Sequence, residues 1–282
     1  MTKQLLLGAH LKTSDGFGLT FARAKAIGAN VVQIFLKSNK SWAMPVHDAA
    51  KLADYKNASV TNHIKSVVAH AGYLINLAAA DEGVLQKSIT SLAEELKCAE
   101  QFGISYLVVH PGSCAATEVG IKRISESINK ALAQVPKAGC TLLLENMAGQ
   151  GSTLGKTFEE LAEIVTGVHH LDRIGFCLDT SHLFAMGYDF TSEKKLDAML
   201  AEFDKIGGLN KLKVVHVNDT KETFGAHKDR HETIGKGNIG LANLRRIVHH
   251  PKLQEKIFIL ETPVDDTPNG YQVHAQEIAD LL

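Results

Sequence analysis

Short apolar runs that end in one histidine or carboxylate recur along this chain, and they constrain its fold more than any other feature. The clearest is Leu142–Ser152, with the sequence LLLENMAGQGS, where an apolar run reaches Glu145 and then breaks into a polar, glycine-rich loop. A short apolar run bounded by turn residues is typical of a strand that is buried on both faces. Because a buried carboxylate is costly unless a cation meets it, Glu145 is expected to face positive charge.

Eight such runs alternate with segments of helical spacing. The predicted strands are Gln4–His10, Val31–Leu36, Ser66–His70, Tyr106–His110, Thr141–Glu145, Ile174–Asp179, Lys213–His216 and Lys256–Glu261. The predicted helices are Leu19–Ile27, Asp48–Thr61, Val84–Phe102, Ile121–Val135, a helix that starts at Thr157, Glu193–Ile206, Ile239–Val248 and Tyr271–Leu282. Asp81 is a predicted N-cap, and Thr157 with Glu160 forms a capping-box pattern.

Strict alternation of strands and helices over 282 residues predicts an α/β protein, a TIM (β/α)8 barrel whose active site lies at the carboxyl ends of the strands. About 250 residues is typical of that fold. No linker or low-complexity segment interrupts the alternation, so residues 1–282 are expected to form a single domain. A doubly wound open sheet is the alternative, but GAHLKTSDGFG after the first strand does not fit the GxGxxG pattern of its nucleotide-binding members.

Composition narrows the class of protein only a little. A hydrophobic content of 45% is ordinary for a globular protein, and a formal net charge of -1 neither indicates nor excludes nucleic acid or a membrane surface as partner. The four cysteines show no CxxC spacing, which is typical of a reduced set in the cytoplasm. The apolar stretch before His10 is too short for a signal peptide, and no run reaches membrane-spanning length. We therefore expect a cytoplasmic protein, with a monomer as the default.

The predicted strand ends would bring many imidazoles and carboxylates to one mouth of the barrel. The residues at those ends are His10, His70, His110, Glu145, Asp179, His216 and Glu261, and the following loops add His182, Asp229 and His231. Imidazole and carboxylate ligands without cysteine suit zinc, manganese or iron. With His10 left aside, these residues would hold two or three ions.

Purely structural roles for these histidines and glycines are the alternative interpretation. A single histidine at a strand end is most often a hydrogen-bonded structural residue, although that interpretation weakens when nearly every strand ends so. Histidines in or beside helices are expected to be structural, namely His63, His169, His170, His249 and His250, while His47 and His227 remain undecided. The glycines of GQGS and IGKGNIG could cradle a phosphate, but glycine turns alone are weak evidence.

Paired divalent ions in a barrel mouth favour two chemistries. They hydrolyse phosphodiesters by activating water and stabilising charge on the attacking and leaving oxygens. Sugar isomerisation on a barrel also uses paired divalent ions, so the residue types alone leave a sugar isomerase or epimerase open. A DNA-binding module that keeps metal only for structure is a third alternative.

The motifs taken in order resemble one family. The set AHAGYLINL, HPGS, LENMAGQGS, DTSH, HVND, DRHETIGKGNIG and LETP resembles the endonuclease IV family of apurinic/apyrimidinic endonucleases, which are trinuclear-zinc TIM barrels of base-excision repair. The resemblance extends over essentially the whole chain. It implies hydrolysis of the phosphodiester 5′ to an abasic site in double-stranded DNA, leaving a 3′-hydroxyl and a 5′-deoxyribose phosphate, with 3′-repair phosphodiesterase activity beside it.

Carried over position by position, the resemblance implies three zinc sites. The first uses His70, His110 and Glu145. The second uses Asp179, His216, Glu261 and the same Glu145 as a bridge, and the third uses His182, Asp229 and His231. Glu145 and Glu261 are the implied catalytic carboxylates, and Mn²⁺ or Fe²⁺ can replace a zinc ion in sites of this kind.

The resemblance also implies the residues that contact DNA. Loops after the second and third strands would enter the minor groove, with Tyr73 and Leu74 filling the gap left by the abasic nucleotide. The other implied DNA contacts are Asn39, Lys40, Trp42 and Arg230. Lys40 stands where the family often has arginine and lacks the planar stacking surface of that residue, and Ser181 replaces a cysteine often found in DTCH.

Overall fold

The computed structural model describes residues 4–137, 139–265 and 270–282. Within them, eight parallel strands close into a barrel in the order β1-β10-β7-β6-β5-β4-β3-β2. The barrel strands are β1 (Leu6–His10), β2 (Val31–Phe35), β3 (Ser66–His70), β4 (Tyr106–Val109), β5 (Thr141–Glu145), β6 (Ile174–Asp179), β7 (Leu212–His216) and β10 (Ile257–Leu260). The predicted TIM barrel is confirmed, and each strand lies within two residues of its predicted bounds.

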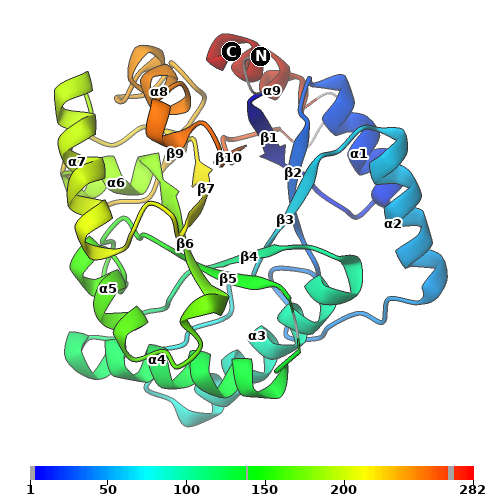
Figure 1. The fold of residues 1–282 in the computed structure, drawn as a ribbon, viewed down its shortest axis with the longest axis vertical. Helices are drawn as coiled ribbons and strands as arrows, with labels where there is room; N and C mark the ends of the chain where they lie inside the picture. Colours follow the sequence, from blue (N-terminus) through cyan, green and yellow to red (C-terminus); the bar gives the residue numbers. More distant parts are fainter. Residues whose placement is uncertain (1–3, 138, 266–269) are drawn as a thin grey trace.

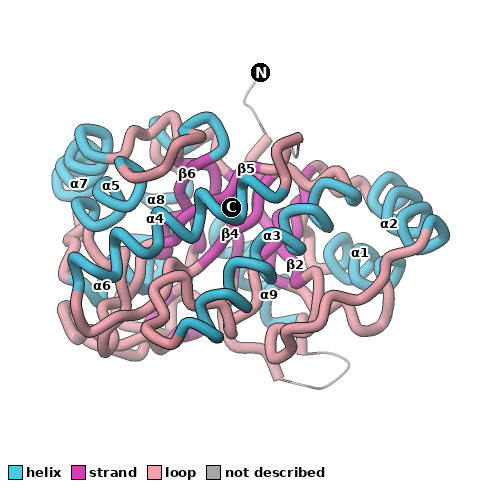
Figure 2. Tube along the Cα trace, turned by 90° about the horizontal axis from the view of Figure 1, so that it is seen from below, coloured by secondary structure: helices cyan, strands magenta, loops and turns pink. Residues whose placement is uncertain are grey.

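Helices surround the strands as an outer ring (Figure 1), and a view turned by 90° shows the strands enclosed by them (Figure 2). The helices of the ring are α1 (Phe17–Ala26), α2 (Ala49–Thr61), α3 (Glu82–Phe102), α4 (Thr117–Gln134), α5 (Phe158–Thr166), α7 (Glu193–Ile206), α8 (Leu241–Val248) and α9 (Gln272–Leu281). Short 3-10 helices cover Leu171–Arg173 and Pro251–Leu253. In the part of the chain that is described, no helix has the length and apolar character needed to cross a membrane.

Alternation along each strand separates two apolar layers. In β5, Leu142 and Leu144 pack toward the helices, whereas Leu143 points into the barrel. The barrel interior is filled by branched apolar residues and one cysteine, which are Val31, Val68, Val108, Leu143, Cys177, Val214, Ile257 and Ile259. Because successive side chains of a strand point to opposite faces, the next inward position after the last of these residues in each strand lies at the mouth of the barrel.

The predicted helix caps are present in the structure. Asp81 accepts a hydrogen bond from the Val84 N–H at 2.8 Å, and Thr157 Oγ1 accepts one from the Glu160 N–H at 3.2 Å. The capping box of α5 differs from the predicted pattern in one respect. Glu160 Oε2 accepts hydrogen bonds from the N–H groups of Gly155 and Lys156, so it reaches the turn before the cap rather than the cap itself.

One segment predicted as a loop is a helix. Thr180–Met186, directly after β6, forms the short helix α6, so His182 lies on a helix and not in a loop. Asp179 caps this helix, since its Oδ1 accepts a hydrogen bond from the His182 N–H at 2.8 Å. Gly187 ends the helix with φ 89°. The same carboxylate that closes β6 therefore also starts α6, which the apolar pattern alone does not reveal.

The long polar segment after β7 is organised by one buried carboxylate. It contains an antiparallel ribbon of β8 (Asp219–Thr220) and β9 (His231–Glu232). Asp219 is fully buried, and its carboxylate accepts hydrogen bonds of 2.9–3.2 Å from the backbone N–H groups of Thr220, Gly235, Gly237, Ile239 and Gly240. A Cβ at Gly237 would lie 2.4 Å from Asp219 Oδ1, so only glycine fits there. These IGKGNIG amides therefore bind the chain's own carboxylate, and that loop is not a phosphate cradle.

We expect Asp219→Asn to lower the free energy of unfolding by about 1–3 kcal/mol, because an amide N–H group would face backbone donors that then lack an acceptor. Chemical denaturation with matched samples measures this difference. Asp172→Asn is the control, since Asp172 is exposed on a 3-10 helix. Equal stability of Asp219→Asn and the control variant would show that the carboxylate does not hold the loop.

Candidate metal centre

The side chains at the mouth follow from strand periodicity. In β5, Leu143 points into the barrel, and Glu145 is the next inward residue, two positions later. The same step of two residues leads from Gly8 or from barrel-interior residues of the other strands to His10, Gln33, His70, His110, Asp179, His216 and Glu261. A ring of imidazole, amide and carboxylate groups therefore lies above the apolar filling of the barrel.

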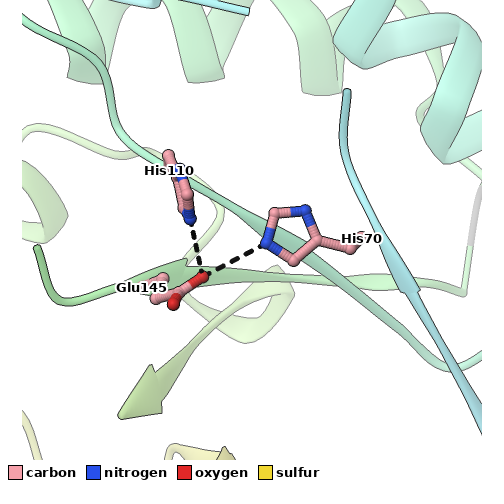
Figure 3. A group of neighbouring side chains, drawn as sticks. All are labelled: His70, His110 and Glu145. Atoms are coloured by element: carbon pink, nitrogen blue, oxygen red, sulfur yellow. Dashed lines mark hydrogen bonds and ion pairs between the residues drawn. The ribbon is translucent and has the colours of Figure 1, made fainter. Parts of the chain in front are cut away.

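The first group of side chains is His70, His110 and Glu145, which Figure 3 shows with both imidazoles directed at the carboxylate. Nε2 of His70 lies 3.3 Å from Glu145 Oε2, and Nε2 of His110 lies 3.1 Å from the same oxygen. Glu145 and His70 are buried, whereas the His110 side chain is 30% exposed. This group is open to the cavity on the His110 side.

The second group consists of Glu145, Asp179, His216 and Glu261. His216 Nδ1 lies 3.1 Å from Glu145 Oε1 and 3.1 Å from Glu261 Oε2, and Asp179 Oδ2 is 3.9 Å from the same nitrogen. Glu145 thus presents Oε2 to the first group and Oε1 to the second. This division of its two oxygens is the geometry of a carboxylate that can bridge two ions.

The third group combines Asp179 of β6, His182 of α6 and His231 of β9, with Asp229 beside them. Asp229 Oδ2 lies 3.2 Å from His182 Nε2, and Asp229 Oδ1 lies 3.3 Å from His231 Nε2. Neither Nε2 atom makes a hydrogen bond within the described residues, although both are buried. Nitrogen and oxygen atoms that lie this close without hydrogen-bonding to one another are typical of ligands arranged around one metal ion.

The spacing of donor atoms fits divalent ions. Ligand atoms about 2.0–2.1 Å from a tetrahedral zinc ion lie about 3.3 Å from one another. The closest nitrogen–oxygen separations in the three groups are 3.1–3.3 Å. Cys177 Sγ also lies near Glu145 and His216, but burial raises the pKa of its thiol to about 12, so it is a poor thiolate donor.

Hydrogen bonds from outside the groups orient the imidazoles. His70 Nδ1 bonds the Ala71 carbonyl at 2.8 Å, and His182 Nδ1 bonds the Asn146 carbonyl at 2.8 Å. His231 Nδ1 is 3.2 Å from the carbonyl of Glu261. In each histidine the other nitrogen is left to face the carboxylates, as is usual for metal ligands.

Sequence reasoning missed the amides that support the groups. Gln33 is fully buried, donates to Glu261 Oε1 at 2.6 Å and presents its own Oε1 to His216 Nε2 at 2.9 Å. Asn218 Nδ2 donates to Asp179 Oδ2 at 2.6 Å. The sequence does carry a signal for Gln33, which is the one polar residue in the apolar run VVQIF. It stands two residues after the inward-pointing Val31 and therefore points inward as well.

Opposite charges within the groups shift the pKa values of their members. Burial by itself raises the pKa of Glu145, but the surrounding imidazoles, led by His216, hold that pKa well below its usual range. Burial lowers the pKa of His231, but carboxylates led by Asp179 outweigh it and raise that pKa to about 9. Asp179 is also the main cause that raises the pKa of His182 against the effect of burial. The metal-free site therefore holds protons at neutral pH that an ion must displace.

The groups open into a cavity of about 370 Å³. Tyr73 lines it and is itself 57% exposed, with its ring stacked on His110 at 5.9 Å between centroids. Leu74 is exposed beside it. Asn39 borders an adjoining pocket that also includes Tyr73 and Glu261.

The other predicted DNA contacts lie farther from the cavity. Lys40 is exposed, and Trp42 packs against α3 in a groove of its own. Arg230 is exposed beside Asp229, where Gln150 Oε1 accepts a hydrogen bond from the Asp229 N–H at 3.1 Å. The GQGS loop thus positions the Asp229–Arg230 segment.

The remaining histidines lie outside the three groups. His249 Nε2 bonds the Leu281 carbonyl at 2.8 Å, and His250 caps a 3-10 helix. His63, His169 and His170 are likewise absent from the groups found in the described residues. Of the two undecided histidines, His47 packs edge-on against Phe102, and His227 lies against Met186.

Comparisons with known proteins agree with this fold and site. The family model described as a xylose isomerase-like TIM barrel matches residues 21–281. The "Probable endonuclease 4" of Halothermothrix orenii is 42% identical over 259 residues, which cover 91% of this chain and 93% of that protein. The solved structure of endonuclease IV from Thermus thermophilus has a TM-score of 0.85 at 34% identity and covers 98% of both chains.

Fold and site define a TIM barrel whose mouth carries clusters of histidine and carboxylate side chains able to bind metal ions. The chain belongs to the endonuclease IV family. A D-psicose 3-epimerase from Clostridium cellulolyticum has a TM-score of 0.72 at 12% identity, which shows a shared fold alone.

We expect the apparent affinity for Zn²⁺ to increase as the pH rises from about 6 to about 9, by roughly tenfold per pH unit for each proton displaced. The sign follows from the pKa values of His182 and His231, which burial lowers but carboxylates led by Asp179 raise overall, because protonated imidazoles compete with the ion. For His231, whose pKa is raised to about 9, this competition persists up to about pH 9. Competition with a chelator of known affinity measures it. A pH-independent affinity across this range would contradict the pKa shifts.

Proposed function

We propose that this chain is a zinc-dependent AP endonuclease of base-excision DNA repair, which hydrolyses the phosphodiester 5′ to an abasic site in duplex DNA. Its products are a 3′-hydroxyl and a 5′-deoxyribose phosphate, and 3′-repair phosphodiesterase activity accompanies the main reaction. The observation that carries the proposal is that three ligand groups meet in one mouth and share Glu145 and Asp179. Relatives named endonuclease 4 over most of the chain support it.

Three zinc ions fit the three groups. His70, His110 and Glu145 would hold the first, and His182, Asp229 and His231 the third. The second would be held by Glu145, Asp179, His216 and Glu261. When bound, such ions supply Lewis-acid activation of water and neutralise charge on phosphate oxygens.

The chain itself supplies orientation and charge balance at the phosphate. Its histidine ligands are neutral when they bind metal, and four carboxylates carry less negative charge than three divalent ions carry positive charge. The mouth then attracts a phosphodiester although the whole chain is close to neutral. His110 and Asp229, the more exposed members of the groups, form the wall that a phosphate would reach first.

Glu145 and Glu261 act as ionised carboxylates. Burial raises the pKa of Glu261, but His216 and its other partners outweigh this effect and hold it well below its usual range, as is true of Glu145. A carboxylate that stays ionised does not donate a proton, so both residues orient ions and accept hydrogen bonds from water. Gln33 and His10 keep Glu261 in place from outside the groups.

Tyr73 and Leu74 form the proposed wedge for the abasic nucleotide. Tyr73 lines the cavity and is 57% exposed, and its neighbour Leu74 is exposed as well. Exposed aromatic and apolar side chains beside a site are typical of a binding surface. Insertion of such residues into the duplex offsets an unstacking cost of a few kcal/mol, which an abasic site already reduces. Asn39, Lys40, Trp42 and Arg230 are the proposed contacts to the flanking strands.

A sugar isomerase or epimerase on this barrel is the rival function. Support for it comes from fold likeness at 12% identity, and no group in the mouth requires a sugar. It leaves the Asp229–His231 segment without a role. A binding module without catalysis is disfavoured because all nine proposed ligands are present and converge.

We also propose that residues 1–282 work as a single-domain monomer in the cytoplasm. The four cysteines form no disulfide, which suits a reducing compartment. Exposed large apolar residues are scattered over several elements rather than gathered on one face. Size-exclusion chromatography with light scattering measures the assembly state.

A duplex with one abasic-site analogue is expected to receive a single nick 5′ to the lesion from protein that carries close to three zinc ions. Metal content and cleavage are measured on the same preparation.

Glu145→Gln is expected to lose turnover by roughly a thousandfold or more and to bind less zinc, because the bridging charge is lost. Full zinc content with near-normal cleavage in this variant would refute the bridging role, and intact DNA with fully loaded wild type would refute the reaction.

Tyr73→Ala and Leu74→Ala are each expected to weaken binding to abasic duplex by about 1–3 kcal/mol, the size of one lost stacking or wedge contact, without changing bound zinc. Val60→Ala is the control, since Val60 is an exposed apolar residue in the last turn of α2, at the end of the barrel opposite the mouth. Unchanged affinity in both loop variants would remove the wedge from the mechanism.

A further inference from the structure

A buried ion pair lies behind the two loops that carry the proposed DNA contacts. Lys37 follows β2, and Glu95 lies on α3. The side chain of Lys37 is 2% exposed and that of Glu95 is 0% exposed, and Lys37 Nζ lies 3.4 Å from Glu95 Oε1. The pair belongs to neither the ligand groups nor the helix caps.

The pair reaches both loops at once. Lys37 Nζ donates to the Trp42 carbonyl at 3.2 Å, midway along the loop between β2 and α2, and to Ser91 Oγ of α3 at 2.5 Å. Glu95 Oε1 accepts a hydrogen bond of 3.3 Å from the Gly72 N–H, which directly precedes Tyr73. One charge pair, anchored on α3 through Glu95, therefore ties down Lys37–Trp42 and Gly72–Leu74 together.

Stability alone does not explain the pair. Desolvating two charges costs about as much as their attraction returns, so apolar residues of similar size often serve a core equally well. Glu95 Oε2 makes no hydrogen bond within the described residues. Burial raises the pKa of Glu95 by more than Lys37 and the Gly72 N–H lower it, so the carboxylate is incompletely compensated.

We propose that the Lys37–Glu95 pair is a positioning device that holds the loops Lys37–Trp42 and Gly72–Leu74 in their DNA-binding conformation before DNA arrives. The inference rests on the proposed function, since it concerns how the same wedge is presented. Ordering a loop on binding costs affinity, and a loop already ordered in the free protein avoids that cost. Lys37 and Glu95 touch neither the substrate nor the reacting atoms and act only through the loops.

The fluorescence of Trp42 can report whether the Lys37–Glu95 pair holds the loop Lys37–Trp42. Trp42 is the single tryptophan, lies on the first loop, and accepts a hydrogen bond from Lys37 through its carbonyl. Its emission and its quenching by acrylamide report the packing of the loop without DNA or metal. The test variant is Lys37→Met with Glu95→Leu, which removes both charges but keeps apolar volume.

In the double variant we expect red-shifted Trp42 emission and stronger quenching, with a thermal midpoint closer to wild type than that of Glu95→Leu alone, which leaves a buried unpaired lysine. The Kd for a duplex with one tetrahydrofuran residue and an uncleavable 5′ linkage should rise on the order of tenfold. KM should rise with kcat within about twofold of wild type, because bound substrate orders the loops. Lys195→Met with Asp189→Leu, an exposed pair near α7, is the matched control.

Unchanged Trp42 emission and quenching in the folded double variant would overturn the proposal, and so would a loosened loop with unchanged Kd. If the double variant does not fold, Lys37→Met carries the same two measurements, because it removes the hydrogen bond to the Trp42 carbonyl and keeps apolar volume. Wild type that neither binds nor cleaves abasic duplex would refute the proposed function, while the Trp42 measurement would still decide whether the pair holds the loop.

Discussion

The structure depends on one buried carboxylate, that of Glu145. It lies at the carboxyl end of β5 with both oxygens turned to imidazoles, and it is fully buried. A carboxylate in that position is tolerable only because four histidines face it. His70, His110 and His216 are placed by the two-residue periodicity of the strands, whereas His182 is placed by α6. If the barrel did not bring the histidines together, the charge of Glu145 would be buried without a partner. The fold therefore stabilises the site, and the paired charges of the site stabilise the fold.

The polar layer is held by a surrounding set of amides and backbone groups. Gln33 joins Glu261 to His216, and Asn218 fixes Asp179. Asp219 binds the backbone N–H groups of the glycine-rich loop that follows β9, the strand that begins with His231. Each of these contacts uses a buried hydrogen bond to fix a side chain or loop that would otherwise sample several conformations, which is how a metal site keeps its geometry.

The comparison with sugar epimerases shows how much of this arrangement belongs to the fold. The closed barrel is shared architecture at 12% identity, and it does not select a substrate. In this chain, residues beyond the strand ends complete the mouth, namely His231 of β9, Asp229 just before it and Tyr73 in the loop after β3. The strands place most of the ligand groups, and the loops shape the cavity through which a substrate would reach them.

The sequence by itself determined the barrel and most of its mouth. Both follow from local pattern, because an apolar run of strand length that ends in His, Asp or Glu predicts a strand and places its last inward side chain, as at His70 and Glu145. The short helix after Asp179 is capped locally, but its span of Thr180–Met186 is too short for helical periodicity to show in the sequence. Only the tertiary structure decided the cage around Asp219 and the Lys37–Glu95 pair. Their partners are far apart in the chain, 58 positions in the last case, and no local periodicity records a contact that arises when distant loops meet.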